Sequence, residues 1–276
     1  MAAQDGVSEA AAQPEPIARY ARRVAAPLER VWENVLDWEH LPHLHHDSFC
    51  GIELEESGAW GWRARALLPP RPKPTALTLE VRIDRAARAY HTRTLAGPGA
   101  GTDIVTRLAT PDPAHTDVSV AFHVPGVPER AREPVGTGYV RLYTRLWDQD
   151  EAMMVRRVAL LSGRAPAAAR PGARPPLALG PLAALRARLP LRVDLAGDGF
   201  RVVEHAGRLL AHPLVCPHLG GPLDEAAVEG GAVICPWHGY RFDCETGHGP
   251  GGQRCRMAVR PRVAVGADGL AQLVVE

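Results

Sequence analysis

The spacing of apolar and polar residues changes along the chain, and each change predicts an element. A strand is expected over about 17–24, and from Leu28 the apolar residues recur at the spacing of an amphipathic helix. Pro27 suits the first turn of that helix. Pro42 prevents the helix from running on, so we expect a second short helix or turn over 43–46. The sequence therefore predicts one strand followed by two short helices.

Six further segments have the composition and alternation of strands, and clusters of Gly, Pro, Asp and Ser that favour turns lie between them. These segments span about 49–56, 58–68, 75–84, 88–96, 101–110 and 115–124. A helical pattern follows from about Tyr139 to Leu161. This order of elements resembles the START-like helix-grip fold, an α+β fold in which a curved antiparallel sheet wraps the last helix. The resemblance implies a cavity for an apolar ligand between sheet and helix.

Composition divides the remainder of the chain. Residues 1–15 are rich in Ala, Gln, Pro and acidic residues without periodicity, which predicts a flexible tail. Six Pro among Ala, Arg and Leu over 164–190 predict a linker, although its Leu-Gly-Pro-Leu-Ala-Ala-Leu-Arg stretch is also compatible with a short helix. We therefore expect a first domain over 16–163 and a second domain of short strands over 191–276.

Two Cys-His pairs lie in the second domain. Cys216 and His218 form a Cys-x-His pair, and after sixteen intervening residues the Cys-x2-His pair of Cys235 and His238 follows. Zinc ligands more often follow Cys-x2-4-Cys and His-x3-5-His spacings. A two-iron cluster fits better, because one iron can take both thiolates and the other both imidazoles. The motif resembles that of an all-β Rieske [2Fe-2S] domain, which implies that these four residues bind the cluster.

The flanking residues indicate the type of Rieske domain. The type found in respiratory complexes carries an additional Cys in each loop, and Gly221 and Trp237 stand at those positions here. The stretches Cys-Pro-His-Leu-Gly-Gly-Pro-Leu and Cys-Pro-Trp-His-Gly-Tyr-Arg-Phe resemble instead the loops of ring-hydroxylating, non-haem iron oxygenases and their ferredoxins. A cluster of this kind transfers electrons singly. We therefore expect another group, in this chain or in a partner, to use the electron.

A second motif lies where the first predicted helix is interrupted. Asn34, Asp37, His40 and His45 follow the spacing Asn-x2-Asp-x2-His-x4-His. This spacing resembles the iron-site motif of Rieske oxygenase catalytic domains, which are themselves elaborated helix-grip folds. The resemblance implies that His40 and His45 bind a mononuclear Fe(II), and that Asp37 joins an iron-ligand His to a cluster-ligand His. Asn34 belongs to the same catalytic motif.

The third iron ligand is expected on the long helix. Non-haem Fe(II) oxygenases use two His and one carboxylate, and the helix offers Asp148, Asp150 and Glu151. Asp150 falls on an apolar stripe, where a lone carboxylate is costly unless a positive partner such as iron faces it, and it is the predicted ligand. The stripe contains Tyr143, Leu146, Trp147, Met153 and Met154. His43 or His46 stays an alternative to either predicted His, because the proline leaves the local geometry open.

The resemblance implies an oxygenase or hydroxylase. Electrons from NAD(P)H would arrive through a separate ferredoxin or flavin reductase and pass through His218 or His238 and Asp37 to the iron. Dioxygen would then oxidise a small apolar substrate, aromatic or polycyclic. In the family the Rieske domain comes first, and electrons pass between neighbours in a ring of three. We therefore expect a homotrimer, although the reversed order found here also allows transfer within one chain.

Two other functions stay open. A START-like domain could hold an apolar ligand without catalysis, while the Rieske domain carries electrons or senses redox state. A non-redox cyclase or dehydratase would instead use His43 or His45 as a general base. Such an enzyme would turn over without dioxygen or reductant, which separates it from an oxygenase.

Charge and composition argue against several classes of protein. Lys and Arg total 32 and Asp and Glu 31, and the net charge of +1 argues neither for nor against a nucleic-acid partner. Because nothing in the sequence resembles a basic recognition stripe, we expect no nucleic-acid partner. No apolar run reaches the ~18 residues of a membrane span, and the N-terminus shows no secretory leader. Five Cys, two of them in the cluster motif, leave an odd remainder that does not suit a secreted disulfide framework. We expect a cytoplasmic protein.

Overall fold

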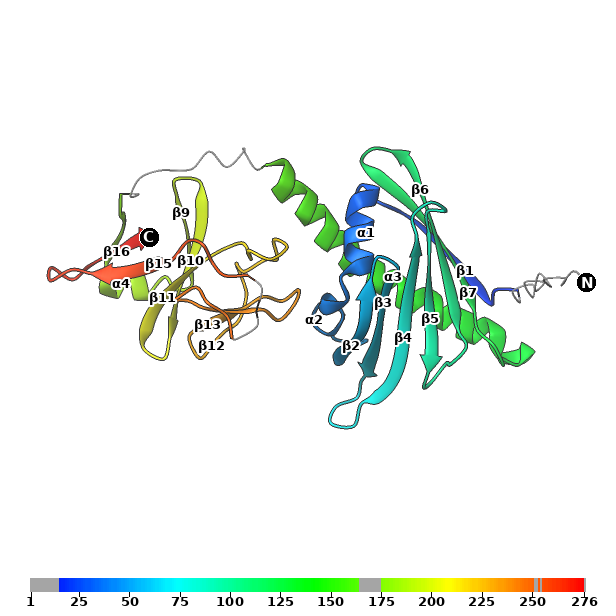
Figure 1. The fold of residues 1–276 in the computed structure, drawn as a ribbon. Helices are drawn as coiled ribbons and strands as arrows, with labels where there is room; N and C mark the ends of the chain where they lie inside the picture. Colours follow the sequence, from blue (N-terminus) through cyan, green and yellow to red (C-terminus); the bar gives the residue numbers. More distant parts are fainter. Residues whose placement is uncertain (1–14, 164–174, 251–252, 254, 276) are drawn as a thin grey trace, which may run out of the picture. The chain divides into compact units, whose positions relative to one another are not determined.

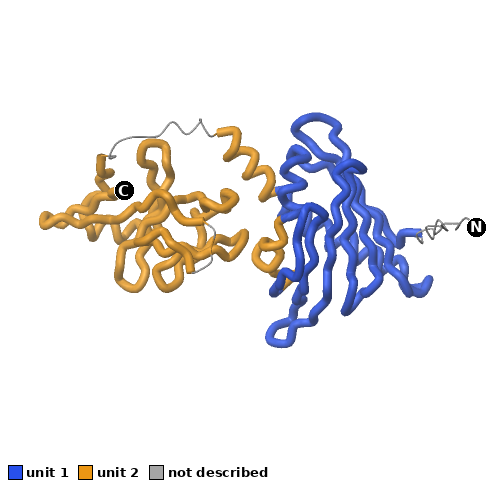
Figure 2. The backbone as a smooth tube through the Cα atoms, viewed as in Figure 1, with its two compact units in different colours: residues 1–36, 50–151 blue, residues 37–49, 152–276 orange. Residues whose placement is uncertain are grey.

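The chain folds into two compact units, coloured separately in Figure 2. Unit 1 comprises Met1–Leu36 and Cys50–Glu151, and unit 2 comprises Asp37–Phe49 and Ala152–Glu276. The computed structural model describes residues 15–163, 175–250, 253 and 255–275. The predicted tail, apart from Glu15, and residues 164–174 of the predicted linker lie outside this described part. Among the described residues, no helix is long and apolar enough to cross a membrane.

Unit 1 is built on one antiparallel sheet with the strand order β1-β7-β6-β5-β4-β3-β2 (Figure 1). Its strands are β1 (Ala18–Val24), β2 (Gly51–Gly58), β3 (Gly61–Leu68), β4 (Thr75–Asp84), β5 (Ala89–Ala96), β6 (Asp103–Asp112) and β7 (His115–His123). Its helices are α1 (Leu28–Leu36) and the part of α3 (Glu129–Ser162) that ends at Glu151. The sheet and the long helix confirm the predicted START-like helix-grip fold.

The sheet packs on the long helix. Phe122 of β7 is fully buried, and its ring centroid lies 5.3 Å from that of Tyr139 and 4.8 Å from that of Tyr143, both on α3. Burial of a side chain of this size contributes about 1.5–3 kcal/mol. A Cβ at Gly136 would lie 2.8 Å from the Ile17 carbonyl oxygen, so the helix approaches the start of the sheet too closely for a side chain there.

The long helix differs from its prediction at the N-terminal end. It begins at Glu129 rather than near Tyr139, and it contains Pro134. The additional turns hold charged residues, this proline and two glycines, and they lack an apolar stripe. Periodicity therefore could not detect them, although the predicted C-terminal end near Leu161 agrees with the structure.

The segment Asp37–Phe49 carries two short turns of helix. These are the 3-10 helix η1 (Trp38–His40) and α2 (Leu41–Leu44), with Pro42 in the first turn of α2. The sequence predicted an interruption with a second helix or turn over 43–46, whereas α1 already ends at Leu36, before Pro42, and α2 spans Leu41–Leu44. It did not predict that the segment belongs to unit 2, whereas α1 and β2, which come before and after it in the chain, belong to unit 1.

The remainder of unit 2 consists of short strands. They are β8 (Leu177–Pro181), β9 (Leu191–Leu195), β10 (Asp198–His205), β11 (Arg208–Pro213), β12 (Val228–Glu229), β13 (Ala232–Ile234), β14 (Arg241–Asp243), β15 (Pro261–Val265) and β16 (Leu270–Val275). They form three-stranded sheets in the orders β11-β10-β9, β12-β13-β14 and β15-β16-β8. Phe200 and Leu273 centre one apolar core, and Val233 and Phe242 centre another beside the Cys-His loops.

Part of the predicted linker is folded. Strand β8 pairs with β16, with Leu177 opposite Leu273, and the short helix α4 (Leu182–Arg186) follows directly. Leu185 of this helix is fully buried. The structure therefore differs from a linker that extends to residue 190, and it favours the short-helix alternative. The pairing partner lies almost a hundred residues further on, so local composition could not indicate it.

Candidate metal sites

The two Cys-His loops have the same backbone geometry. The amide of Cys216 donates to the Gly221 carbonyl (2.9 Å), and the amide of Gly220 donates to the Cys216 carbonyl (3.1 Å). The corresponding bonds of the second loop, Cys235 to Tyr240 and Gly239 to Cys235, are both 2.8 Å. Gly220 and Gly239 both have positive φ, at 85° and 66°, which a side chain would disfavour.

The side chains of the two loops point to one another. Cys216, Cys235 and His238 are buried, His218 is half-buried, and the two imidazole centroids lie 4.5 Å apart. The Cys216 thiol donates a hydrogen bond to Cys235, which lowers the pKa of the Cys235 thiol. The thiolate is the form that binds metals. A Cβ at Gly221 would lie 2.6 Å from the Cys235 sulfur, so only glycine leaves this space open.

These donors fit a Rieske cluster. The Nδ1 atoms of His218 and His238 are buried and make no hydrogen bond of normal geometry with any described residue. Buried polar atoms usually find a partner, and iron would supply one here. Two adjacent sulfurs and two adjacent ring nitrogens are the ligand set of a cluster with thiolates on one iron and imidazoles on the other.

Asp37 connects this donor set to a second one. Its Oδ2 atom lies 2.7 Å from His238 Nε2 and 3.6 Å from His40 Nδ1. Burial would raise the pKa of the Asp37 carboxyl, but the hydrogen bond with His238 and the nearby His40 imidazole hold that pKa well below its usual range. The carboxylate is therefore charged at neutral pH. The sequence left open whether His218 or His238 meets Asp37, and the structure has the contact at His238.

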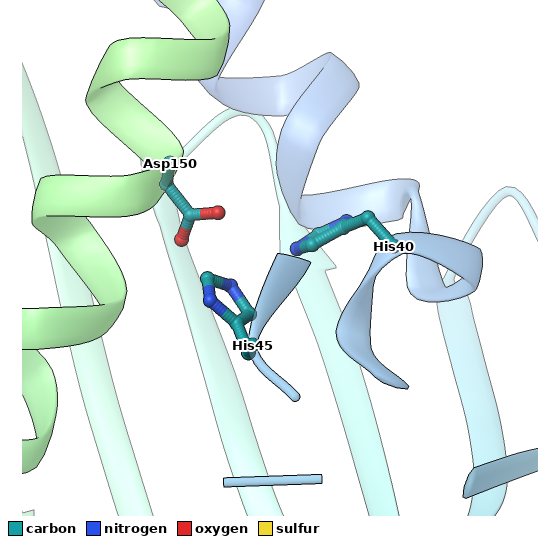
Figure 3. Close-up of side chains that lie close together, drawn as sticks. All are labelled: His40, His45 and Asp150. Atoms are coloured by element: carbon teal, nitrogen blue, oxygen red, sulfur yellow. The ribbon is translucent and has the colours of Figure 1, made fainter. Parts of the chain in front are cut away.

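The second donor set consists of His40, His45 and Asp150 (Figure 3). One ligand atom of each side chain lies within 4.8 Å of those of the other two. The exposed fractions of the three residues are 4%, 2% and 9%, and the two imidazole centroids are 5.0 Å apart. Two imidazoles and one carboxylate on one side of a site are the ligands of non-haem Fe(II) oxygenases, so these residues fit a mononuclear iron.

Asn34 lies next to this donor set. Its side chain is 5% exposed, and its Nδ2 atom donates a 3.0 Å hydrogen bond to Asp150 Oδ1. The sequence motif grouped Asn34 with the catalytic residues but did not indicate which residue it contacts. In the structure, Asn34 orients the carboxylate, which is the part a neighbouring residue commonly plays for a metal ligand.

The alternative ligands lie elsewhere. Asp148 and Glu151 both pair with Arg22, at 2.9 and 2.5 Å. His43 packs on Gly239, where a Cβ would overlap its ring. The His46 side chain is 69% exposed and lies 3.4 Å from Asp47. None of the four alternatives, Asp148, Glu151, His43 or His46, belongs to the described cluster of possible metal ligands.

One contact beside the second loop was not predicted. Tyr240 Oη donates a 2.8 Å hydrogen bond to Glu39 Oε2, and the Tyr240 ring stacks on His218 with centroids 4.5 Å apart and an 18° angle between planes. Neither the cluster motif nor the iron-site motif indicated the bond between Tyr240 and Glu39. These two residues are 201 positions apart, and nothing local to either indicates the other.

Comparison with known proteins supports the assignment of the two Cys-His loops to a Rieske domain. Residues 176–258 match the family described as the Rieske [2Fe-2S] domain. A stretch of 55 residues is 38% identical to apoptosis-inducing factor 3 of Mus musculus, and the same holds for the Homo sapiens protein. That stretch is 20% of this chain and only 9% of either relative. The C-terminal part of the chain thus contains a Rieske domain, which has the capacity for electron transfer.

Solved structures resemble unit 1. The aromatase/cyclase Zhui from Streptomyces sp. R1128 is 20% identical, with a TM-score of 0.44 over 53% of this chain and 98% of that protein. A START superfamily protein from Mycobacterium smegmatis is 17% identical, with a TM-score of 0.39 over 49% of this chain and 97% of that protein. Likeness at this level concerns the fold and carries no functional conclusion.

Proposed function

We propose that this chain is a Rieske-type oxygenase that oxidises a small apolar substrate, aromatic or polycyclic in kind. The cluster ligands in this proposal are Cys216, His218, Cys235 and His238, and the Fe(II) ligands are His40, His45 and Asp150. The cluster supplies electrons singly, and the iron supplies a site at which dioxygen is activated beside the substrate.

The observation that carries the proposal is the pair of contacts made by Asp37. Its Oδ2 atom lies 2.7 Å from an imidazole of the cluster donor set and 3.6 Å from an imidazole of the iron donor set. A single carboxylate therefore stands between His238 and His40. Because Asp37, His40 and His238 are in the same chain, the proposed path for electrons needs no neighbouring subunit, and a homotrimer is not required for it.

The residues around the two donor sets have defined tasks. Asp37 accepts a hydrogen bond from the Nε2–H group of His238, which favours the tautomer that leaves the Nδ1 lone pair for iron. Asn34 donates to one oxygen of Asp150 and so orients the carboxylate. Metal ligands held in this way keep their geometry when a substrate or dioxygen enters.

Aromatic residues of unit 1 support an apolar substrate. Trp32 and Tyr90 are buried with ring centroids 6.3 Å apart. Burial raises the pKa of Tyr90 and of Tyr143 above the usual range, so both hydroxyls stay neutral. The proposed substrate meets uncharged aromatic rings near Asp150. A ferredoxin or flavin reductase that draws on NAD(P)H is the proposed source of electrons.

The test is an iron count on full-length protein purified without oxygen. Wild type is expected to contain two cluster irons and one further iron per chain, and His40→Ala only the two cluster irons, with the Rieske EPR signal intact. His46→Ala, at an exposed His outside both donor sets, serves as the control and keeps all three. A wild-type protein that takes up only the cluster irons would reduce the function to a redox carrier with a ligand-binding domain.

A further inference from the structure

We propose that Glu39 and Tyr240 form a positioning pair that holds Asp37 on His238. The inference deepens the proposed function, and rests on it for the use made of the Asp37 contact. Neither residue belongs to a donor set. Their hydrogen bond, from Tyr240 Oη to Glu39 Oε2 at 2.8 Å, lies beside the Asp37–His238 bond of 2.7 Å.

Two parallel contacts define an orientation that one contact cannot. Asp37 and Glu39 are two residues apart in the chain, as are His238 and Tyr240. Asp37 binds His238, and Glu39 binds Tyr240. A single hydrogen bond would leave the segment 37–49 free to rotate about the carboxylate. The second bond fixes the direction from which the carboxylate approaches His238, and hydrogen-bond strength depends steeply on that direction.

The residue between the two contacts packs as well. A Cβ at Gly239 would overlap the ring of His43, so the loop backbone lies directly against this imidazole. Three successive loop residues, His238, Gly239 and Tyr240, thus meet the segment 37–49. Leu44 of the same segment packs on the apolar core beside the cluster loops. The hydrogen bond between Glu39 and Tyr240 fixes how the segment 37–49 is aligned on the loop in this apolar contact.

Tyr240 also links the pair to the first cluster loop. Its ring lies flat on His218, 4.5 Å away with an 18° angle between planes, and 6.0 Å from the ring of His238. A tyrosine held at its hydroxyl by Glu39 keeps its ring in one plane. The stacked His218 is thereby limited in its rotation, so one hydrogen bond orders both the approach of Asp37 and the half-buried cluster ligand.

The experiment measures amide hydrogen exchange in full-length protein with its cluster bound. Tyr240→Phe keeps the ring on His218 but removes the donor, and we expect the amides of 37–49 to exchange about five to ten times faster, as loss of one hydrogen bond of ordinary strength allows. Glu39→Ala should have the same effect. Glu39→Gln retains an acceptor and should stay near wild type. The EPR signal of the reduced cluster should not change, because all four ligands remain.

Asp47→Asn is the matched control. It removes a carboxylate from the same segment, where Asp47 faces only the exposed His46 among its described ion pairs, and exchange over 37–49 should not change. Unaltered exchange in both Tyr240→Phe and Glu39→Ala would overturn the proposal.

A second readout separates this proposal from the proposed function. Tyr240→Phe should slow the loss of the reduced-cluster EPR signal in air, and should add nothing to an Asp37→Asn protein. Full additivity of the two substitutions would show that Tyr240 acts independently of Asp37 and would overturn the positioning role. The exchange result does not depend on iron at His40 and His45, so failure of the iron count would leave it intact.

Discussion

Asp37 and His238 lie 201 positions apart in the sequence and share a 2.7 Å hydrogen bond between carboxylate and imidazole. The aspartate precedes a short helical turn in the START-like half of the sequence, and the histidine lies in the second loop of the Rieske domain. The contact falls inside one compact unit, because the segment 37–49 packs with the C-terminal part of the chain. Under the proposed function, this contact would allow electron transfer within a single chain.

Asp37→Asn should keep all metal ligands and impair only the contact of residue 37 with His238 and His40, which joins the two donor sets. The amide can still accept a hydrogen bond from His238, but it lacks the charge that strengthens the bond. We expect an unchanged iron content and a reduced cluster that is oxidised by dioxygen about tenfold to a hundredfold more slowly, which stopped-flow absorbance would measure. Asp47→Asn should behave as wild type. Equal rates in Asp37→Asn and wild type would remove the carboxylate from the electron path.

Mixed variants should fail to complement each other. Cys235→Ser lacks the cluster and His40→Ala lacks the mononuclear iron, so neither can move an electron between the sites. If the path lies within one chain, co-expression of the two should leave the His40→Ala cluster as slow to reoxidise as it is alone. Faster reoxidation in the mixture would mean transfer between subunits, as in the homotrimers of the resembled family.

Asn34→Ala should weaken iron binding without affecting the cluster. Its hydrogen bond orients Asp150, and loss of such a bond commonly costs about tenfold to a hundredfold in metal affinity. Titration of Fe(II) into the protein under anaerobic conditions would measure the affinity. The control is Glu33→Gln, one position before Asn34, which removes the charge that pairs with Arg30. An unchanged affinity for Fe(II) in Asn34→Ala would show that Asp150 needs no such orientation.

Gly239→Ala should destabilise unit 2 by more than backbone strain alone. A residue with a Cβ in the left-handed region costs about 1–2 kcal/mol, and Gly230→Ala, with φ of 59° and open space around its Cβ, isolates that cost. Gly239→Ala adds overlap with His43. The temperature at which the cluster absorbance is lost should therefore fall further for Gly239→Ala.

A second substitution should restore part of the stability that Gly239→Ala loses. His43→Ala removes the ring that the new methyl group would overlap, so the double variant should recover to the level of Gly230→Ala. A Gly239→Ala protein no less stable than Gly230→Ala would show that the loop and the segment 37–49 do not touch in solution.

The sequence predicted what depends on local spacing. The alternation in β3 to β7 and the turn residues between them indicated the sheet, and the helical stripe around Asp150 distinguished it from Asp148, whose side chain is 61% exposed. The Cys and His spacings indicated both donor sets. Each of these patterns lies within a short stretch of the chain, so a period or a motif is sufficient to detect it, although the stretches that supply one donor set can be far apart.

Long-range pairing was not accessible in the same way. Three contacts join segments that are distant in sequence. They are the bond of Asp37 with His238 rather than His218, the Glu39–Tyr240 bond and the pairing of β8 with β16. Composition misled where prolines sit at the ends of elements: Pro181 closes β8 and precedes α4, so a proline-rich stretch that suggested a linker holds folded elements instead.

The helix α3 limits how this protein can be divided. Asp150 lies in unit 1, whereas Arg156 Nε, two turns further along the same helix, donates a 2.9 Å hydrogen bond to the Gly220 carbonyl of the first cluster loop. Leu160 packs on the same glycine, and Met153 belongs to the core beside the loops. A fragment cut at residue 176, where the Rieske match begins, would lose this support. Chimeras that exchange the C-terminal half must therefore carry the last turns of the preceding helix with it.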